Sequence, residues 1–264
     1  MNGAVWVYAV VPEPAGDNGT DLLSGDTTGV AGESVRLVAE GGLAAATGSV
    51  PLSDFAEEPL KEHLEDLRWL EAAARAHHQV IEELHRATDV VPLQFATVYH
   101  DDDAVRAVLA GRAGDFAAAF ARTRGRDEWG VKAYVDPGAP APAAEPEESG
   151  GGTPGTAYLL RRKAEQRSRE DAYGRAEKRA EQLRAALADT AEQEVAHRPQ
   201  DQRLAGYEGW MILNDSFLVP RAGAEDFSTC VTACREQFPD VRLEVSGPWP
   251  PYSFVGRENR EERP

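Results

Sequence analysis

Two Glu-x-x-His pairs have the residue types and spacing that best suit metal chemistry in this sequence: Glu82 with His85, and Glu194 with His197. Side chains three positions apart share one face of a helix, and di-iron bundles combine two such pairs with a Glu from each of two more helices. Here strands are expected to separate the helices, and His77 lies on a predicted apolar stripe, as a core residue would. We therefore predict no metal site. A metal-binding enzyme built on these pairs is the alternative.

The two cysteines, Cys230 and Cys234, stand four positions apart in a predicted helix. This spacing points both thiols the same way, but a disulfide between them would be strained. Two thiols alone cannot complete a tetrahedral metal site. We expect reduced, partly buried thiols, as in a cytosolic protein.

The glycine-rich segment Gly150–Gly155 lacks the parts of a phosphate-binding loop, because no Lys-Ser/Thr pair follows it and no strand leads into it. The sequence also has no Gly-x-Ser-x-Gly nucleophile elbow. The residues therefore predict neither a catalytic group nor a cofactor site, and we expect a protein that is not an enzyme.

The net charge of −17 over 264 residues argues against nucleic acid and anionic lipid as partners, since both require Lys and Arg to neutralise phosphate. The longest apolar run near the start, Ala4–Val11, is closed by Pro12 and is far shorter than a membrane-spanning helix. No basic region precedes it, so we expect a buried strand and no secretory signal.

The first part of the chain, residues 1–124, predicts an α/β domain with the order β-β-β-α-β-α. Gly41-Gly42 separates two short apolar runs, which indicates a hairpin. Leucines and small residues at steps of three and four indicate a long or kinked helix. The expected elements are strands Val5–Val11, Val35–Glu40, Leu43–Val50 and Val90–Val98, a helix over Glu57–Leu84 and a helix over Asp102–Arg122.

Residues 125–264 predict a second domain in the order β-α-β-β-α-β, a modified ferredoxin-like arrangement with a long helix. The fold class is therefore α+β with two α/β domains. Residues 136–155 read as a disordered insertion that folding does not need, and 256–264 as a charged tail. The expected elements are Trp129–Val135, a helix from Thr156 towards His197, a weak strand at Leu204–Tyr207, Trp210–Val219, a helix over Ala224–Phe238, and Val241–Ser246.

Charge is divided unevenly along the sequence. Residues 1–124 hold nine basic and 20 acidic side chains, a net charge of −11, against −6 for residues 125–264. Within the second part, Arg161–Arg184 is locally basic at +4. Such a stretch is most simply a solvated helix face with i,i+4 pairs, and its functional interpretation is the docking of an acidic surface from the same chain or from another one.

Three prolines and three aromatic residues crowd the segment Gly247–Phe254. Proline prevents the segment from continuing a sheet. The simplest role is a cap that folds back on the core. The functional role would be a stiff contact surface with Trp249, Tyr252 and Phe254 as anchors.

This segment also carries a family resemblance, because VSGPWPPYSFV at Val245–Val255 resembles the C-terminal signature of the GvpF/GvpL gas vesicle proteins. Blocks along nearly the whole chain are similar to the family in the same order. They are the opening VWVYAVV, LEDLRWLEAAARAHHQVIEEL at Leu64–Leu84, VVPLQFATVY at Val90–Tyr99, EWGVKAYVD at Glu128–Asp136 and GWMILNDSFLV at Gly209–Val219.

The resemblance implies a cytoplasmic accessory or minor structural protein of the gas vesicle, without catalytic residues or cofactors. Its implied partners are the small hydrophobic major shell protein, of the GvpA type, and other gas vesicle accessory proteins. We expect residues 1–124 to carry the shell-protein contact, through the edge of the hairpin or of the first strand with Val5 and Val7. The alternative to the family interpretation is a generic cytoplasmic adapter.

Overall fold

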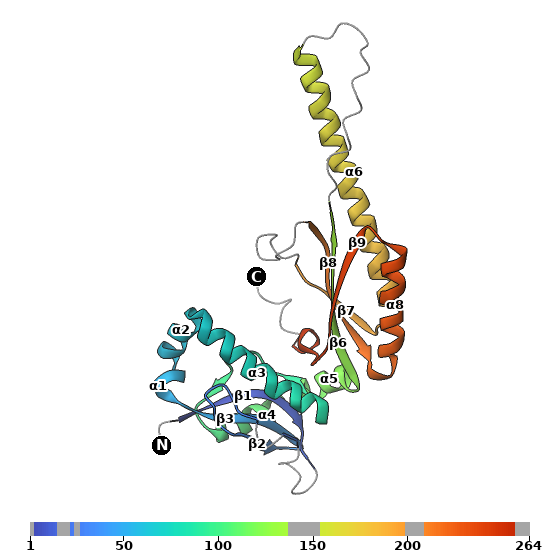
Figure 1. The fold of residues 1–264 in the computed structure, drawn as a ribbon. Coiled ribbons are helices and arrows are strands. Elements are labelled where there is room, and N and C mark those ends of the chain that lie inside the picture. Colours follow the sequence, from blue (N-terminus) through green and yellow to red (C-terminus); the bar gives the residue numbers. More distant parts are fainter. Residues whose placement is uncertain (1–2, 15–21, 24–26, 137–153, 199–208, 257–264) are drawn as a thin grey trace. The chain divides into compact units, whose positions relative to one another are not determined.

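The chain folds into two α/β units, which the computed structural model describes over residues 3–14, 22–23, 27–136, 154–198 and 209–256 (Figure 1). The first unit contains residues up to Glu128 together with those from Pro248 onward, and the second contains Trp129–Gly247. The expected boundary after residue 124 therefore lies four residues further on in the structure. The segment after Gly247 belongs to the first unit. The hydroxyl of Tyr252 lies 2.8 Å from His78 Nδ1, and the hydroxyl of Ser253 donates to Glu128 at 2.6 Å.

The sheet of the first unit has β1 near its centre, in the order β2-β3-β1-β4, with β5 also paired to β1. The predicted hairpin is present: Gly41 and Gly42 have φ of 61° and 81°, the left-handed values that a two-residue hairpin turn requires. The strands are β1 (Gly3–Pro12), β2 (Val35–Glu40), β3 (Leu43–Pro51), β4 (Val91–Pro92) and β5 (Val98–Tyr99).

Helices cover both faces of this sheet (Figure 1). Alternate residues of β1 point to opposite faces, so Trp6 and Tyr8 pack towards α3, while Val5 and Val7 pack towards α4 and α5. The helices are α1 (Leu52–Phe55), α2 (Glu57–Glu65), α3 (Leu67–Ala87), α4 (Asp102–Gly111) and α5 (Ala113–Thr123).

Two predicted elements of the first unit are divided in the structure. The helical stripe breaks at Asp66, whose carboxylate accepts hydrogen bonds from the N–H groups of Arg68 and Trp69 and thereby caps α3. The predicted strand Val90–Val98 was wrong as one element. It forms β4 and β5 with a turn between them, because Pro92 donates no hydrogen bond to a ladder and Ala96 has φ of 64°.

The second unit is a four-stranded sheet in the order β7-β8-β6-β9, with α6 and α8 packed in one apolar core. Val131, Leu183, Phe217 and Phe227 are fully buried there. The elements are β6 (Arg126–Val135), α6 (Pro154–Ala188), β7 (Gln193–Ala196), β8 (Trp210–Pro220), α8 (Ala224–Gln237) and β9 (Val241–Trp249).

The position of β7 corrects the predicted helix end. The helix was expected to reach His197, but α6 ends at Ala188, where the Thr190 hydroxyl donates to the Leu187 carbonyl at 2.9 Å. Residues 193–196 then pair antiparallel with β8, and this tertiary pairing outweighs their helix propensity. The ferredoxin-like description stays a prediction.

Several predicted segments lie outside the described residues. These are the strand at Leu204–Tyr207, the insertion 136–155 except for Asp136 and the first residues of α6, and the tail 256–264 except for Gly256. None of the helices in the described ranges combines the length and apolar character that a bilayer-spanning segment requires.

A polar cluster in the first unit depends on two glycines. The Tyr8 hydroxyl donates to Glu33 Oε1 at 2.5 Å and accepts from the Val30 N–H at 2.9 Å. A Cβ atom on Gly29 or Gly48 would lie 2.0 Å from that same Glu33 oxygen. Burial and the Glu33 carboxylate raise the pKa of Tyr8 well above its usual value, so the hydroxyl remains a donor.

Gly48→Ala is expected to lower the free energy of unfolding by about 1–3 kcal/mol, because displacing Glu33 leaves the buried Tyr8 hydroxyl without its acceptor. Urea denaturation measures the change. Gly114→Ala is the matched control, since nothing lies within 4 Å of a Cβ there and alanine is favoured in a helix. Equal effects of the two substitutions would contradict this account of Gly48.

Candidate partner-contact site

Among the described residues, neither Glu-x-x-His pair belongs to a cluster of side chains that could hold a metal ion. His85 Nε2 lies 2.8 Å from Asp127 Oδ1, and Glu82 pairs with Arg86. The second pair lies on and just after strand β7, where residues three apart point to opposite faces. Within the described ranges, no group of three or more His, Cys, Asp or Glu side chains is placed to hold a metal ion.

Both cysteines are free thiols, and Cys234 is buried on α8. Burial, followed by the neighbouring Cys230, raises the pKa of the Cys234 thiol to about 11. Cys230 Sγ lies 3.3 Å from the carbonyl of Ala186. A protonated, buried thiol is a poor nucleophile, so Cys234 fits the reduced thiol predicted at its position.

Strand β1 offers no free edge to a partner. It pairs with β3 on one side and with β4 and β5 on the other. Val5 is 5% exposed and Val7 is 1% exposed. The interpretation of the first strand as an edge therefore fails, because a partner could reach these valines only by opening the sheet.

The hairpin does provide an edge, because β2 pairs with β3 and with no other described strand on its outer side. The side chains of β2 pack on both faces of the sheet. Val35 and Leu37 pack on the face covered by α3, and Val38 packs on the face covered by α4 and α5. Ala39 is exposed. At the other side of the sheet, β4 and β5 have two residues each, so β2 is the longer free edge.

The backbone groups of Ala39 point away from β3. The Glu13 N–H donates to the Gly42 carbonyl, and Leu43 lies opposite Pro12, which has no N–H. Backbone groups along a strand alternate sides, so those of Leu43 face β2 and those of Ala44 face β1. Ala39 lies opposite Ala44, and its own N–H and C=O are therefore directed outward.

The end of the proline-aromatic segment is fixed to the first unit. Phe254 is fully buried, and its carbonyl accepts a hydrogen bond from Arg122 Nε at 2.8 Å. The N–H and hydroxyl of Ser253 both donate to the Glu128 carboxylate, at 2.7 and 2.6 Å. Sequence reasoning missed Arg122 and Glu128, because no local pattern links them to residues more than a hundred positions away.

Of the three aromatic residues predicted as contacts, Trp249 keeps the most exposed surface. Its side chain is 37% exposed and lies 5.4 Å, between ring centroids, from His78. The Tyr252 hydroxyl lies 2.8 Å from His78 Nδ1, and burial raises the pKa of Tyr252 above its usual value. Of the contacts predicted from the sequence, the β2 edge and Trp249 are those that stay accessible within the described residues.

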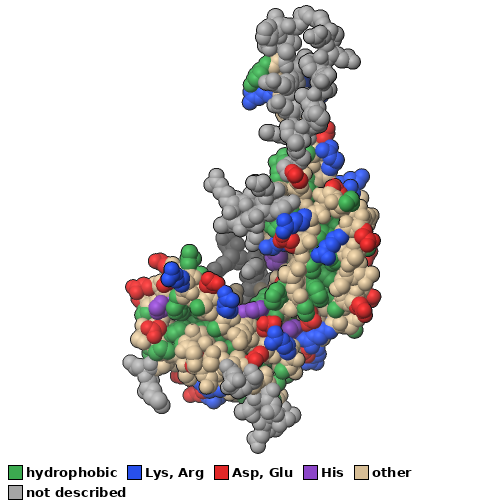
Figure 2. Space-filling view, in the orientation of Figure 1, with side chains coloured by type: hydrophobic (Ala, Val, Ile, Leu, Met, Phe, Trp, Pro, Cys, Tyr) green, Lys and Arg blue, Asp and Glu red, His purple; other side chains and the backbone are tan. Residues whose placement is uncertain are grey.

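Acidic side chains surround the end of the first unit that α1 and α2 form (Figure 2). Glu57, Glu58, Glu62 and Glu65 are all on α2, with Lys61 paired to the first two. The helix has no buried residue. Helix α2 therefore supplies mainly charge to the surface, while Phe55 of α1 is buried in the core and Leu60 of α2 packs against it.

Sequence comparison places the chain in a family. The family model described as gas vesicle synthesis protein GvpL/GvpF matches residues 4–256. Gas vesicle protein L of Streptomyces sp. (strain CB03234) is 43% identical over 256 residues, covering 95% of this chain and 92% of the relative. Gas vesicle protein F of the same strain is 29% identical over 235 residues, covering 84% and 88%. The chain belongs to the GvpL/GvpF family of gas vesicle proteins, as the sequence blocks predicted.

Solved structures share the fold. The crystal structure of gas vesicle protein GvpF from Anabaena sp. PCC7120 matches with a TM-score of 0.69 at 17% identity, covering 96% of each chain. GvpF from Microcystis aeruginosa matches with a TM-score of 0.66 at 19% identity, covering 97% of this chain and 99% of that one. The predicted mixed α/β class is confirmed. Family membership associates the chain with gas vesicles and makes other gas vesicle proteins its expected partners.

Proposed function

We propose that this protein binds the hydrophobic major shell protein of the gas vesicle, limits its aggregation, and helps to nucleate or extend the vesicle wall. The GvpL/GvpF membership supports the gas vesicle role. The observation that carries the shell-protein contact is the free outer side of β2 in the more acidic part of the chain.

An outer strand with unpaired backbone groups is a template for strand addition. In this mode the main chain supplies affinity, and the partner need only present an extended segment. The outward groups of Ala39 and of Leu37, two positions earlier, form such a row, and before them Ser34 pairs with Thr28 in an isolated antiparallel bridge. The side chain of Arg36, also on β2, is held by Asp102. Its Nη1 and Nη2 donate to the two oxygens of that carboxylate, at 2.9 and 2.6 Å.

Charge explains how such a contact limits aggregation. A shell subunit exposes apolar surface before assembly and is prone to self-association. A bound partner with a net charge of −17 would give the complex the repulsion that opposes association. A short edge of six residues makes a small contact, which suits a subunit that must be released to the growing wall.

The second candidate contact is Trp249, an exposed aromatic side chain at the end of a rigid segment. Partly exposed tryptophans often anchor protein interfaces. In that case a partner would bind through side chains and would not depend on the β2 backbone. The generic adapter stays a further alternative, with another cytoplasmic protein as the partner.

Ala39→Pro is expected to weaken suppression of shell-protein aggregation by about tenfold, as measured by the concentration of this protein that halves light scattering. Proline removes the outward N–H, and the loss of one hydrogen bond of about 1.4 kcal/mol is a tenfold change in binding. The full chain is mixed with shell protein diluted from denaturant. Ala39→Thr is the matched control, because threonine keeps the N–H and suits a strand.

The proline variant should remain folded, since the Ala39 side chain is exposed and its N–H does not pair with β3. Circular dichroism and the urea midpoint check this directly. If a folded Ala39→Pro variant suppresses aggregation as well as Ala39→Thr does, the β2 edge is not the contact. If Trp249→Ala abolishes suppression instead, the contact is the proline-aromatic segment.

A further inference from the structure

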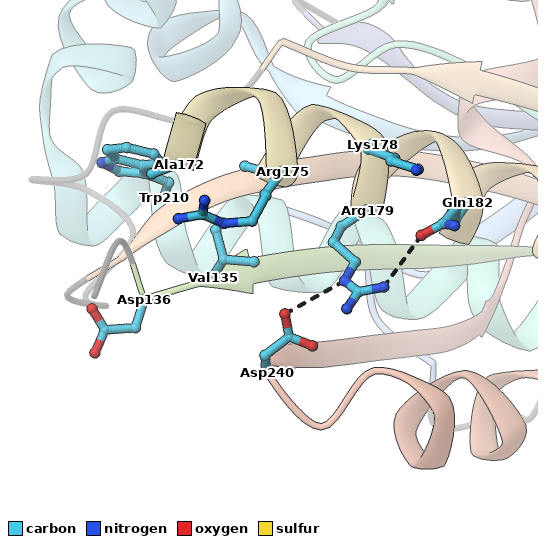
Figure 3. A pocket seen from close by; sticks show the side chains of 10 residues that line it. Val135, Asp136, Ala172, Arg175, Lys178, Arg179, Gln182, Trp210 and Asp240 are labelled. Atoms are coloured by element: carbon cyan, nitrogen blue, oxygen red, sulfur yellow. Dashed lines mark hydrogen bonds and ion pairs between the residues drawn. The ribbon is translucent and has the colours of Figure 1, made fainter. Parts of the chain in front are cut away.

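A hollow of about 350 Å³ lies beside α6 in the second unit (Figure 3). Its volume is in the range of ligand and peptide side-chain pockets. Residues from α6 form one wall, and the ends of β6, β8 and the residue before β9 complete it. The lining side chains used below are Val135, Asp136, Arg175, Ala176, Lys178, Arg179, Trp210 and Asp240.

Arg179 is held in a fixed orientation within this hollow. Its Nε lies 3.4 Å from Asp240 Oδ2, and its Nη1 lies 3.3 Å from Gln182 Oε1. The dashed lines in Figure 3 mark both contacts. The guanidinium also lies 4.8 Å from the centre of the Phe238 ring. These contacts reduce the entropy that Arg179 would lose on binding an anion.

Arg175 and Lys178 are exposed and have no ion pair within the described part of the chain. Arg184, further along the same helix, differs from them because its Nε lies 2.8 Å from the buried Asp215 carboxylate. Three cations and two carboxylates, Asp136 and Asp240, therefore line the hollow. In a chain of net charge −17 this is a local excess of positive charge.

An aromatic wall stands next to these cations. Trp210 stacks on Tyr173 with the ring centroids 4.1 Å apart and the planes at 8°. Val135 and Ala176 add apolar surface. Tryptophan and arginine together are the side chains that contribute most at protein interfaces.

We propose that this hollow binds an acidic segment of a partner protein. Its carboxylates would pair with Arg175, Lys178 and Arg179, and an apolar side chain would pack against Trp210. Positions 175 and 178 are one turn apart on the helix, about 5–6 Å between Cβ atoms, which suits two separate carboxylates. This proposal does not depend on the β2 contact.

The test uses the full chain and a fluorescein-labelled peptide, Glu-Glu-Leu-Glu-Glu-Leu, with Gln replacing Glu in a control peptide. Fluorescence anisotropy at low ionic strength measures Kd. The double variant Arg175→Gln, Lys178→Gln is expected to raise Kd about tenfold, because each exposed ion pair contributes a few-fold. The matched control, Arg162→Gln with Lys163→Gln, makes the same charge change at exposed positions of the same helix outside the hollow and should change Kd less than about twofold.

Three results would overturn the proposal: no difference between the Glu and Gln peptides, equal weakening by the two double variants, or displacement of the peptide by inorganic phosphate at matched ionic strength. The second result would assign binding to the diffuse charge of α6, and the third to a small-anion site. Selective loss in the Arg175, Lys178 variant with phosphate inactive supports it.

Discussion

Phe254→Ala is expected to lower the free energy of unfolding by about 3–5 kcal/mol, the usual cost of removing a buried aromatic ring. The Phe254 side chain is fully buried, and the hydrogen bonds of its carbonyl with Arg122 and of Ser253 with Glu128 hold the backbone on both sides of it. These bonds prevent the chain from shifting to fill the cavity. Urea denaturation followed by circular dichroism measures the loss.

Trp249→Ala is the matched comparison in the same segment, and we expect it to cost less than about 1 kcal/mol. Its side chain is 37% exposed and contributes mainly a ring contact with His78, so less apolar area returns to water. If Trp249→Ala destabilised the protein more than Phe254→Ala, the segment would not be anchored as described here.

Stability is expected to fall by about 3 kcal/mol as the pH drops from 6.5 to 4, owing to His77 alone. Burial lowers the pKa of His77 to about 4 from its ordinary 6.5, and the neighbouring His78 adds to the shift. Between pH 4 and 6.5 the unfolded chain therefore binds a proton at His77, and the folded chain does not. The stability is fully present above pH 6.5 and is lost progressively as the pH falls towards 4.

The neutral state of His77 has a structural reason. The indole N–H of Trp6 donates to His77 Nδ1 at 3.0 Å inside the core, which requires that nitrogen to be unprotonated. Tyr8 and Phe95 pack around the ring, at 5.3 and 5.5 Å between centroids. Protonation would thus break a buried hydrogen bond and place a charge among aromatic side chains.

His77→Gln tests this assignment, because the glutamine oxygen can accept from Trp6 and does not titrate. The variant should show a flatter dependence of unfolding free energy on pH between 4 and 6.5 than the parent. His100→Gln changes an exposed histidine and should leave the parental slope. A His77→Gln variant that kept the full slope would assign the acid sensitivity to other groups.

Local pattern predicted most elements of the fold. The apolar β-branched run near the start, the Gly41-Gly42 turn and the stripe of α3 each have a period or a turn residue that only one structure satisfies. Asp101 caps α4 beside the predicted helix start at Asp102, whereas the Asp66 cap of α3 divides a helix that was predicted over Glu57–Leu84. These features depend on residues that are close in sequence, so the tertiary structure does not alter them.

Sheet order and long-range contacts could not be predicted in this way. An apolar strand is compatible with a central or an outer place, so only the structure shows that β1 is enclosed and that β2 has one neighbouring strand among the described residues. The strand Gln193–Ala196 has helix-forming residues and exists because β8 pairs with it. The burial of Phe254 depends on Glu128 and Arg122, which no spacing rule connects to it.

The gas vesicle role came from sequence blocks of the family and not from the chemistry of any site. The physical reading of the residues led to an acidic α/β protein in which no catalytic group was recognised. The structure adds that β2 has no second strand beside it among the described residues and that the Trp249 side chain is partly exposed. It also removes Val5, Val7 and Phe254 from the set of accessible residues.

Photo-crosslinking to the major shell protein tests the central claim most directly. A benzophenone side chain in place of Ala39, in place of Trp249, or in place of the exposed Ser228 on α8 reports which surface the shell subunit touches. We predict a crosslinked product from position 39 and none from position 228. Crosslinking from position 249 alone, with a folded and unreactive protein labelled at position 39, would contradict a contact at the β2 edge.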